Sequence, residues 1–206
     1  MKNVIIFGDS YSTFEGEMPP GHTYYYPRLD VVKKEQTWWS LFFEKTGYKL
    51  IYNDSWSGST IGYTGYNNYD CSKTSSFICR YKKLKESGFF NDNVADTVIV
   101  LGGTNDSWAD APLGKMQFSE WQEKDLFKVL PAICYFLYSL NEALPDAEIL
   151  CVINTDMKAE IVDCMEKAAE YYGLKSLRLH DVDKENGHPT VKGMTEICDQ
   201  IIAAIR

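Results

Sequence analysis

The sequence predicts an α/β fold in which a parallel sheet is flanked by helices. Apolar segments rich in β-branched residues, such as 4–7 and 96–101, alternate along the chain with segments of helical spacing, such as 158–172. Strands buried on both faces form continuous apolar runs, and their alternation with helices is typical of a parallel sheet. Because no repeat, low-complexity tract or linker divides the 206 residues, we expect one domain spanning 1–206.

Five strands and five helices are predicted in chain order. The strands are expected at 4–7, 49–53, 96–101, 148–153 and 174–179. The helices are expected at 37–45, 72–87, 120–143, 158–172 and 191–205. Gly47 and Gly173 are placed to end two of these helices, because glycine is common just past a helix C-terminus. Pro131 lies inside the third helix, so we expect a bend there or a break into two helices.

The segment 13–36 is expected to be a long loop, because it contains several glycines and prolines. Tyr24, Tyr25 and Tyr26 stand in its middle. They either form an aromatic wall over a functional site or are loop residues packed against the domain.

Composition excludes several classes of partner. The net charge is −8, from 21 basic and 29 acidic residues, and no basic stripe is present, so nucleic acid and anionic membranes are poor partners. No apolar run approaches the roughly 18 residues that a membrane span needs. The six cysteines form no Cys-x-x-Cys pair, which indicates free, buried thiols in a reducing compartment. With three histidines, none near a cysteine pair, zinc is not expected.

The N-terminus bears on location. Met1 and Lys2 lead directly into the first predicted strand, with no cleavable segment before it. We therefore expect a cytoplasmic protein.

A serine, Ser10, follows the first predicted strand almost at once. In an open parallel sheet, ligands bind outside the carboxyl ends of the strands, so Ser10 lies where such a fold places its chemistry. Its hydroxyl is either a nucleophile or a helix cap, because serine is also a favoured N-cap residue. Three distant segments decide between these: NDSWSGS at 53–59, VIVLGGTND at 98–106 and ENGHP at 185–189.

Together with Gly-Asp-Ser at 8–10, these segments resemble the four sequence blocks of the SGNH/GDSL hydrolases. The matching positions are 8–10, Gly58, Gly-Thr-Asn-Asp at 103–106 and His-Pro at 188–189, in the family's order and across nearly the whole chain. The resemblance implies a flavodoxin-like, three-layer α/β/α fold around a central parallel five-stranded sheet. It also implies an enzyme that needs neither a metal nor a cofactor.

The resemblance assigns roles to individual residues. Ser10 would be the nucleophile, and His188 the base that a serine hydroxyl needs in order to attack at neutral pH. The oxyanion hole would be formed by the backbone N–H groups of Ser10 and Gly58 and the side-chain amide of Asn105.

The third member of the triad departs from the family pattern. The family has an aspartate three residues before the histidine, where this chain has Glu185. Asp183, five residues before His188, is the competitor. A Ser-His dyad oriented by a backbone carbonyl is the remaining possibility.

These residues predict a serine esterase that cleaves carboxylic esters through an acyl-enzyme. Trp108, Tyr11 and Trp56 are expected in the substrate pocket, where an aromatic ring could contact an acyl chain or a sugar. By analogy with the family, short acyl groups are favoured, among them acetyl esters of carbohydrates. The alternative is a non-catalytic small-molecule or carbohydrate-binding module on the same fold. The expected partner is a small-molecule ester, and the oligomeric state is not predicted.

Overall fold

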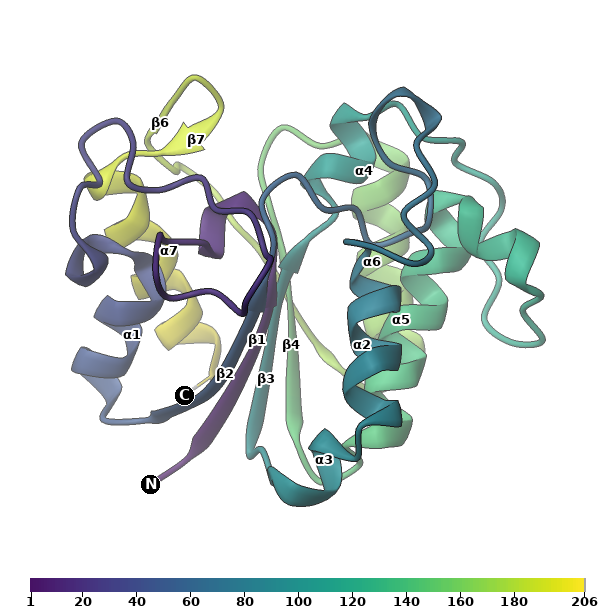
Figure 1. The fold of residues 1–206 in the computed structure, drawn as a ribbon, viewed down its shortest axis with the longest axis horizontal. Helices are drawn as coiled ribbons and strands as arrows, with labels where there is room; N and C mark the ends of the chain where they lie inside the picture. Colours follow the sequence, from purple (N-terminus) through teal and green to yellow (C-terminus); the bar gives the residue numbers. More distant parts are fainter. Residues whose placement is uncertain (206) are drawn as a thin grey trace.

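The computed structural model describes residues 1–205 and contains a five-stranded sheet between two layers of helices (Figure 1). Its strands are β1 (Asn3–Gly8), β2 (Lys49–Ser55), β3 (Thr97–Gly102), β4 (Glu148–Ile153) and β5 (Lys175–Arg178). They pair in the order β2-β1-β3-β4-β5, and every neighbouring pair is parallel. The predicted fold class is confirmed. Arg206, the last residue of the predicted domain, lies outside the described residues.

Helices cover both faces of the sheet (Figure 1). Helices α1 (Trp38–Thr46) and α7 (Val191–Ile205) pack together on one face, and α2 (Phe77–Glu86), α5 (Val129–Ala143) and α6 (Ala159–Tyr171) lie on the other. Shorter elements complete the chain: α3 (Phe89–Asp92), α4 (Thr104–Trp108), the 3-10 turns η1 (Ser10–Ser12), η2 (Lys34–Gln36), η3 (Tyr66–Asn68) and η4 (Glu123–Phe127), and a hairpin of β6 (Lys184–Glu185) and β7 (His188–Pro189).

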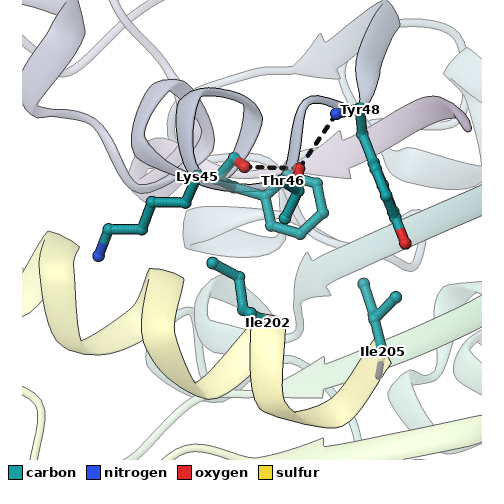
Figure 2. A pocket seen from close by; sticks show the side chains of 6 residues that line it. Lys45, Thr46, Tyr48, Ile202 and Ile205 are labelled. Carbon is teal, nitrogen blue, oxygen red and sulfur yellow. Dashed lines mark hydrogen bonds between the residues drawn. The ribbon is translucent and has the colours of Figure 1, made fainter. Parts of the chain in front are cut away.

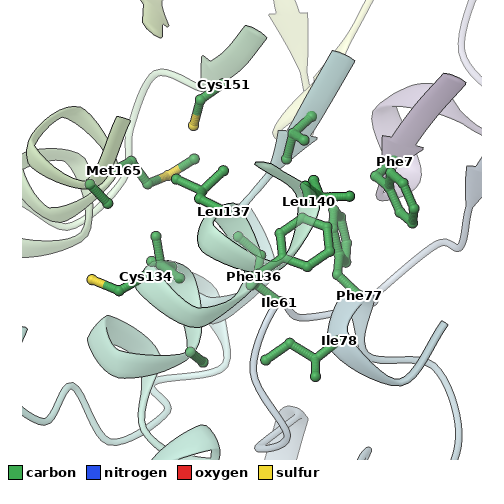
Figure 3. Packing of buried hydrophobic residues seen from close by; sticks show 14 of the residues in the cluster. Phe7, Ile61, Phe77, Ile78, Cys134, Phe136, Leu137, Leu140, Cys151 and Met165 are labelled. Atoms are coloured by element: carbon green, nitrogen blue, oxygen red, sulfur yellow. The ribbon is translucent and has the colours of Figure 1, made fainter. Parts of the chain in front are cut away.

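The core lies on both sides of the sheet because successive strand side chains point to opposite faces. In β1, Val4 and Ile6 pack toward α1 and α7, whereas Phe7 packs toward α2 and α5. Figure 3 shows Phe136 of α5 between two other rings, with centroid distances of 5.5 Å to Phe7 and 5.7 Å to Phe77. Burying one such side chain contributes about 1.5–3 kcal/mol, so this packing fixes β1 and the residues that follow it.

Helix ends follow local capping. The Thr37 side chain accepts a hydrogen bond from the Ser40 N–H at the start of α1, and Gly47, with a φ of 68°, ends that helix. The predicted helix at 72–87 begins later, because the Ser76 hydroxyl accepts from the Cys79 N–H and so starts α2 at Phe77.

The predicted helix at 120–143 is two elements, η4 and α5. The break is at Lys128, whose backbone is extended. Pro131 lies in the first turn of α5, where its missing N–H removes no helical hydrogen bond. The predicted break is therefore present, but it precedes the proline.

A cavity of about 230 Å³ lies between α1 and α7 (Figure 2). It is lined by Phe42, Lys45, Thr46, Tyr48, Ile202 and Ile205. Because Tyr48 directly precedes β2, the cavity is at the edge of the sheet where the strands begin, opposite the edge where Ser10 follows β1. It is therefore separate from the residues singled out by the sequence.

Two further predictions concern cysteines and membrane spans. All six cysteines are buried and free of disulfides, as predicted. Across residues 1–205, no helix is both long enough and apolar enough to cross a membrane.

Candidate active site

The Ser10 hydroxyl is not used as a helix cap. Ser10 begins the turn η1 directly after β1, and the cap of that turn is Asp9, whose Oδ1 accepts a hydrogen bond from the Tyr11 N–H at 3.1 Å. The backbone carbonyl of Ser10 accepts from the Thr13 hydroxyl at 3.0 Å. Ser10 is 5% exposed, and its hydroxyl points to a histidine from the far end of the chain.

That histidine is His188. Its Nε2 lies 3.0 Å from Ser10 Oγ, and its Nδ1 lies 3.2 Å from the backbone carbonyl of Asn186. Because a carbonyl oxygen can only accept, Nδ1 must carry the proton in the neutral ring. Nε2 is then free to accept the proton of the Ser10 hydroxyl, which is the tautomer that a general base requires.

His188 stands on the short hairpin of β6 and β7. The two residues of its turn, Asn186 and Gly187, have φ angles of 50° and 76°, as type I′ turns require. A Cβ at position 187 would also lie 2.9 Å from the Trp108 ring, so only glycine fits there. We treated this segment as a loop, although Asn-Gly is a recognised hairpin signal.

Neither candidate acid contacts the imidazole. Among residues 1–205, no carboxylate forms a hydrogen bond with His188. Asp183 instead accepts a hydrogen bond from the Thr190 hydroxyl, just before α7. Glu185 pairs with His188 across the hairpin backbone, but its side chain is exposed. The arrangement observed is the remaining possibility, a backbone carbonyl at Nδ1.

The predicted oxyanion donors lie on two neighbouring segments. Asn105, in α4, is 4% exposed, and its Nδ2 donates to the Ser59 carbonyl at 3.0 Å. The Tyr66 hydroxyl donates to Asn105 Oδ1 at 2.8 Å, which fixes the amide with its NH₂ toward the Ser59 side. Gly58 is exposed and has a φ of 80°, a conformation that favours glycine.

Two buried aspartates brace these loops. Asp106 Oδ2 and Oδ1 accept from the N–H groups of Ile61 and Gly62, at 2.8 and 3.2 Å. Burial raises the pKa of Asp106 to about 6. Burial, together with the nearby charge of Asp106, raises the pKa of Asp9 to about 7.

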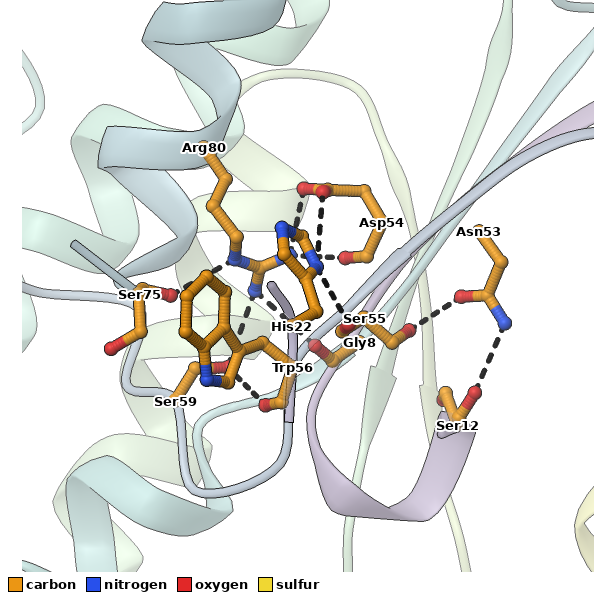
Figure 4. Close-up of polar contacts among 10 residues, drawn as sticks. All are labelled: Gly8, Ser12, His22, Asn53, Asp54, Ser55, Trp56, Ser59, Ser75 and Arg80. Carbon is orange, nitrogen blue, oxygen red and sulfur yellow. Dashed lines mark hydrogen bonds and ion pairs between the residues drawn. The ribbon is translucent and has the colours of Figure 1, made fainter. Parts of the chain in front are cut away.

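A buried arginine connects the nucleophile turn to the Gly58 loop (Figure 4). Arg80 of α2 is 3% exposed and pairs with Asp54 Oδ2 at 2.7 Å. It also donates to the Gly8 carbonyl at 3.2 Å, to Ser59 Oγ at 3.2 Å and to the Ser75 carbonyl at 2.9 Å. Sequence analysis missed Arg80, because an arginine within a helical pattern carries no local signal of burial.

The three predicted pocket aromatics have different surroundings. Trp108 is 39% exposed, with its ring centroid 5.9 Å from that of His188, so it borders the site. Tyr11 is fully buried, and its hydroxyl donates to the Gly187 carbonyl at 2.5 Å, so its placement in an open pocket is corrected. Trp56 packs on His22, with centroids 4.4 Å apart, and lines a cavity of about 240 Å³ beside Arg80.

Electrostatics lower the proton affinity of His188. Burial depresses its pKa below the ordinary value, and the positive charges of Arg28 and Lys184 act in the same direction. The Asn186 carbonyl opposes this shift. The imidazole is therefore neutral, and able to accept a proton, to a lower pH than an ordinary histidine. Within the part of the chain described, no group of three or more His, Cys, Asp or Glu side chains could bind a metal ion.

Comparison with known proteins gives consistent matches. The family model for GDSL-like lipases and acylhydrolases matches residues 2–205. The crystal structure of a GDSL-like lipase from Bacteroides uniformis has a TM-score of 0.92 and 40% identity, covering 100% of this chain and 95% of that one. One from Bacteroides ovatus has a TM-score of 0.92 and 38% identity, covering 100% and 98%.

More distant structures share the fold. An acetyl xylan esterase from the rumen bacterium Butyrivibrio proteoclasticus has a TM-score of 0.66 at 18% identity, covering 100% of this chain and 63% of its own. No match was found among curated proteins.

Proposed function

Because the chain belongs to the GDSL-like lipase and acylhydrolase family and is an ester hydrolase, we propose that it cleaves short-chain carboxylic esters through an acyl-enzyme on Ser10. The observation that carries this proposal is the 3.0 Å contact between Ser10 Oγ and His188 Nε2. A serine hydroxyl within hydrogen-bond reach of a correctly protonated imidazole is the geometry that nucleophilic catalysis requires.

The proposed reaction has two halves. In the first, Ser10 Oγ attacks the ester carbonyl while His188 Nε2 accepts its proton, and the imidazolium then protonates the departing alcohol. In the second, His188 takes a proton from water, which attacks the acyl-enzyme and releases the carboxylic acid and Ser10. The Asn186 carbonyl maintains the hydrogen bond to Nδ1–H throughout.

The tetrahedral oxyanion would be stabilised by three donors. These are the backbone N–H groups of Ser10 and Gly58 and the Nδ2 of Asn105. Each such donor contributes about 2.7–4 kcal/mol to the transition state. The fixed amide orientation of Asn105 supports its role, because Tyr66 occupies its Oδ1 and leaves the NH₂ group as the donor.

We propose a small acyl group, with acetyl esters of carbohydrates as the leading candidates. Ser10 is 5% exposed, which favours a small acyl group over a long chain. Trp108 and Tyr66 are 39% and 40% exposed and contact His188 and Asn105 respectively. Their partly exposed rings offer faces on which a sugar could pack.

Serine-directed labelling tests the mechanism. A fluorophosphonate should modify Ser10, as mapped by mass spectrometry, and Ser10→Ala should lower esterase activity at least about 10³-fold. The panel is p-nitrophenyl acetate, butyrate and octanoate together with an acetylated xylo-oligosaccharide. Ser40→Ala, on α1, is the control serine. Labelling at another residue, or full activity in Ser10→Ala, would overturn the proposal. Preference for octanoate would overturn the substrate assignment alone.

A further inference from the structure

The imidazole of His188 lies flat against an aromatic ring. The ring of Tyr25 stacks on it with a centroid distance of 3.6 Å and an angle of 5° between the planes. The Tyr11 ring approaches the same imidazole at 5.5 Å. Since no carboxylate among residues 1–205 contacts this histidine, these rings are the side chains that restrict its rotation.

Two buried tyrosine hydroxyls bind the backbone on either side of His188. The Tyr11 hydroxyl donates to the Gly187 carbonyl at 2.5 Å, and the Tyr26 hydroxyl donates to the Pro189 carbonyl at 2.7 Å. Both tyrosines are fully buried. The residues immediately before and after His188 are thus fixed by groups from the N-terminal part of the chain.

The same tyrosines are connected to the nucleophile. Tyr11 directly follows Ser10 in the turn η1. The Tyr25 N–H donates to Thr13 Oγ1 at 2.9 Å, and that hydroxyl donates to the Ser10 carbonyl at 3.0 Å. A continuous set of hydrogen bonds therefore sets the position of the stacked ring relative to Ser10.

We propose that Tyr11, Tyr25 and Tyr26 form a tyrosine cradle that positions His188 in place of a triad carboxylate, with the stacked face of Tyr25 stabilising the imidazolium that forms during attack. This inference rests on the proposed function. The three tyrosines are positioning residues, because they act through His188 and not on the substrate.

A triad carboxylate has two tasks, and each has a substitute here. It fixes the tautomer, which the Asn186 carbonyl does at Nδ1. It also stabilises the imidazolium, for which the negative face of an aromatic ring is an uncharged alternative. The cations Arg28 and Lys184 oppose the imidazolium, although Lys184 pairs with Asp156 at 3.2 Å, and Glu185 across the hairpin is exposed.

The first test compares substitutions of Tyr25. Tyr25→Leu removes the π face but remains apolar, and we expect kcat to fall about tenfold with little change in KM, and the His188 pKa to decrease. Tyr25→Phe keeps the ring and should stay within about twofold of wild type in kcat. Tyr24→Leu, at the exposed neighbouring position, is the matched control. The pKa is measured by NMR of the imidazole, alongside the acid limb of kcat/KM.

The second test separates positioning from stability. Tyr26→Phe and Tyr81→Phe each remove one buried hydroxyl that donates to a backbone carbonyl at 2.7 Å, but Tyr81 contacts Ser139, on α5. We expect similar losses in melting temperature and a fall in kcat, about two- to tenfold, only in Tyr26→Phe. Equal kcat values in the two variants would overturn the cradle.

The two proposals fail in distinguishable ways. If wild-type protein is not labelled at Ser10, the proposed function fails and the cradle with it. If wild-type protein is labelled and active, but Tyr25→Leu is labelled and turns over equally fast, only the cradle is wrong. Should Tyr25→Leu fail to fold, the Tyr26→Phe and Tyr81→Phe pair decides the question alone.

Discussion

The two sides of the candidate active site are built from different interactions. On the nucleophile side, buried charges fix the backbone: Arg80 pairs with Asp54 and binds the Gly8 carbonyl, while Asp106 binds two N–H groups of the loop after Gly58 (Figure 4). On the base side, His188 is surrounded by neutral groups, a stacked ring, two phenol hydroxyls and a backbone carbonyl.

This difference has an energetic consequence. Breaking a buried ion pair leaves an uncompensated charge and is strongly destabilising, whereas the loss of a neutral hydrogen bond or a ring contact has a smaller, graded effect. The nucleophile side should therefore respond to substitution by unfolding. The base side should respond by losing activity while the fold persists.

The largest effect is expected for Arg80→Met. Asp54, 2% exposed, would remain charged and unpaired, so the free energy of unfolding should fall by about 3–5 kcal/mol, measured by urea denaturation. Arg178→Met is the matched control, because its ion pair with Glu166 is exposed and should contribute under about 1 kcal/mol. The double variant Arg80→Met/Asp54→Leu should recover much of the loss. Equal effects of Arg80→Met and Arg178→Met would remove the distinction between the two sides.

A dependence of stability on pH should come from the nucleophile side. The pKa of buried Asp9 is raised to about 7, while an unfolded aspartate titrates near about 3.9. The folded state therefore binds the extra proton between these values. The stability that this proton contributes is complete below about pH 4 and is lost as the pH rises toward 7, by up to about 1.4 kcal/mol per pH unit.

Asp9→Asn isolates this contribution. The substitution should flatten the decline in the free energy of unfolding between pH 5 and pH 7, and the slope is the quantity to compare. Asp181→Asn, at a side chain that is 96% exposed, should leave the slope unchanged. A wild-type slope that survives in Asp9→Asn would assign the titration to another group and would weaken the contrast between charged and neutral sides.

The two sides also differ in how far the sequence predicts them. Patterns within one segment predict β4 and α7 at their observed bounds, because burial and helical periodicity are local properties. The motifs indicate that Ser10 and His188 approach each other. The contacts that position them have no local signature, because Arg80 reaches Gly8 across 72 residues and Tyr11 reaches Gly187 across 176. Such contacts become visible only once the topology is known.

The smallest effect is expected where the family pattern places the triad acid. Glu185→Gln should change kcat by less than about threefold, because the Glu185 side chain is exposed and the Asn186 carbonyl is already at Nδ1. Loss of a working triad carboxylate lowers kcat by about 10⁴-fold, so steady-state kinetics distinguish the two cases clearly. Asp183→Asn retains an oxygen that can accept from the Thr190 hydroxyl, so kcat should be similarly unaffected. A fall of 10²-fold or more in either variant would mean that the hairpin rearranges during turnover to bring that carboxylate to His188, and the base side would then depend on charge as the nucleophile side does.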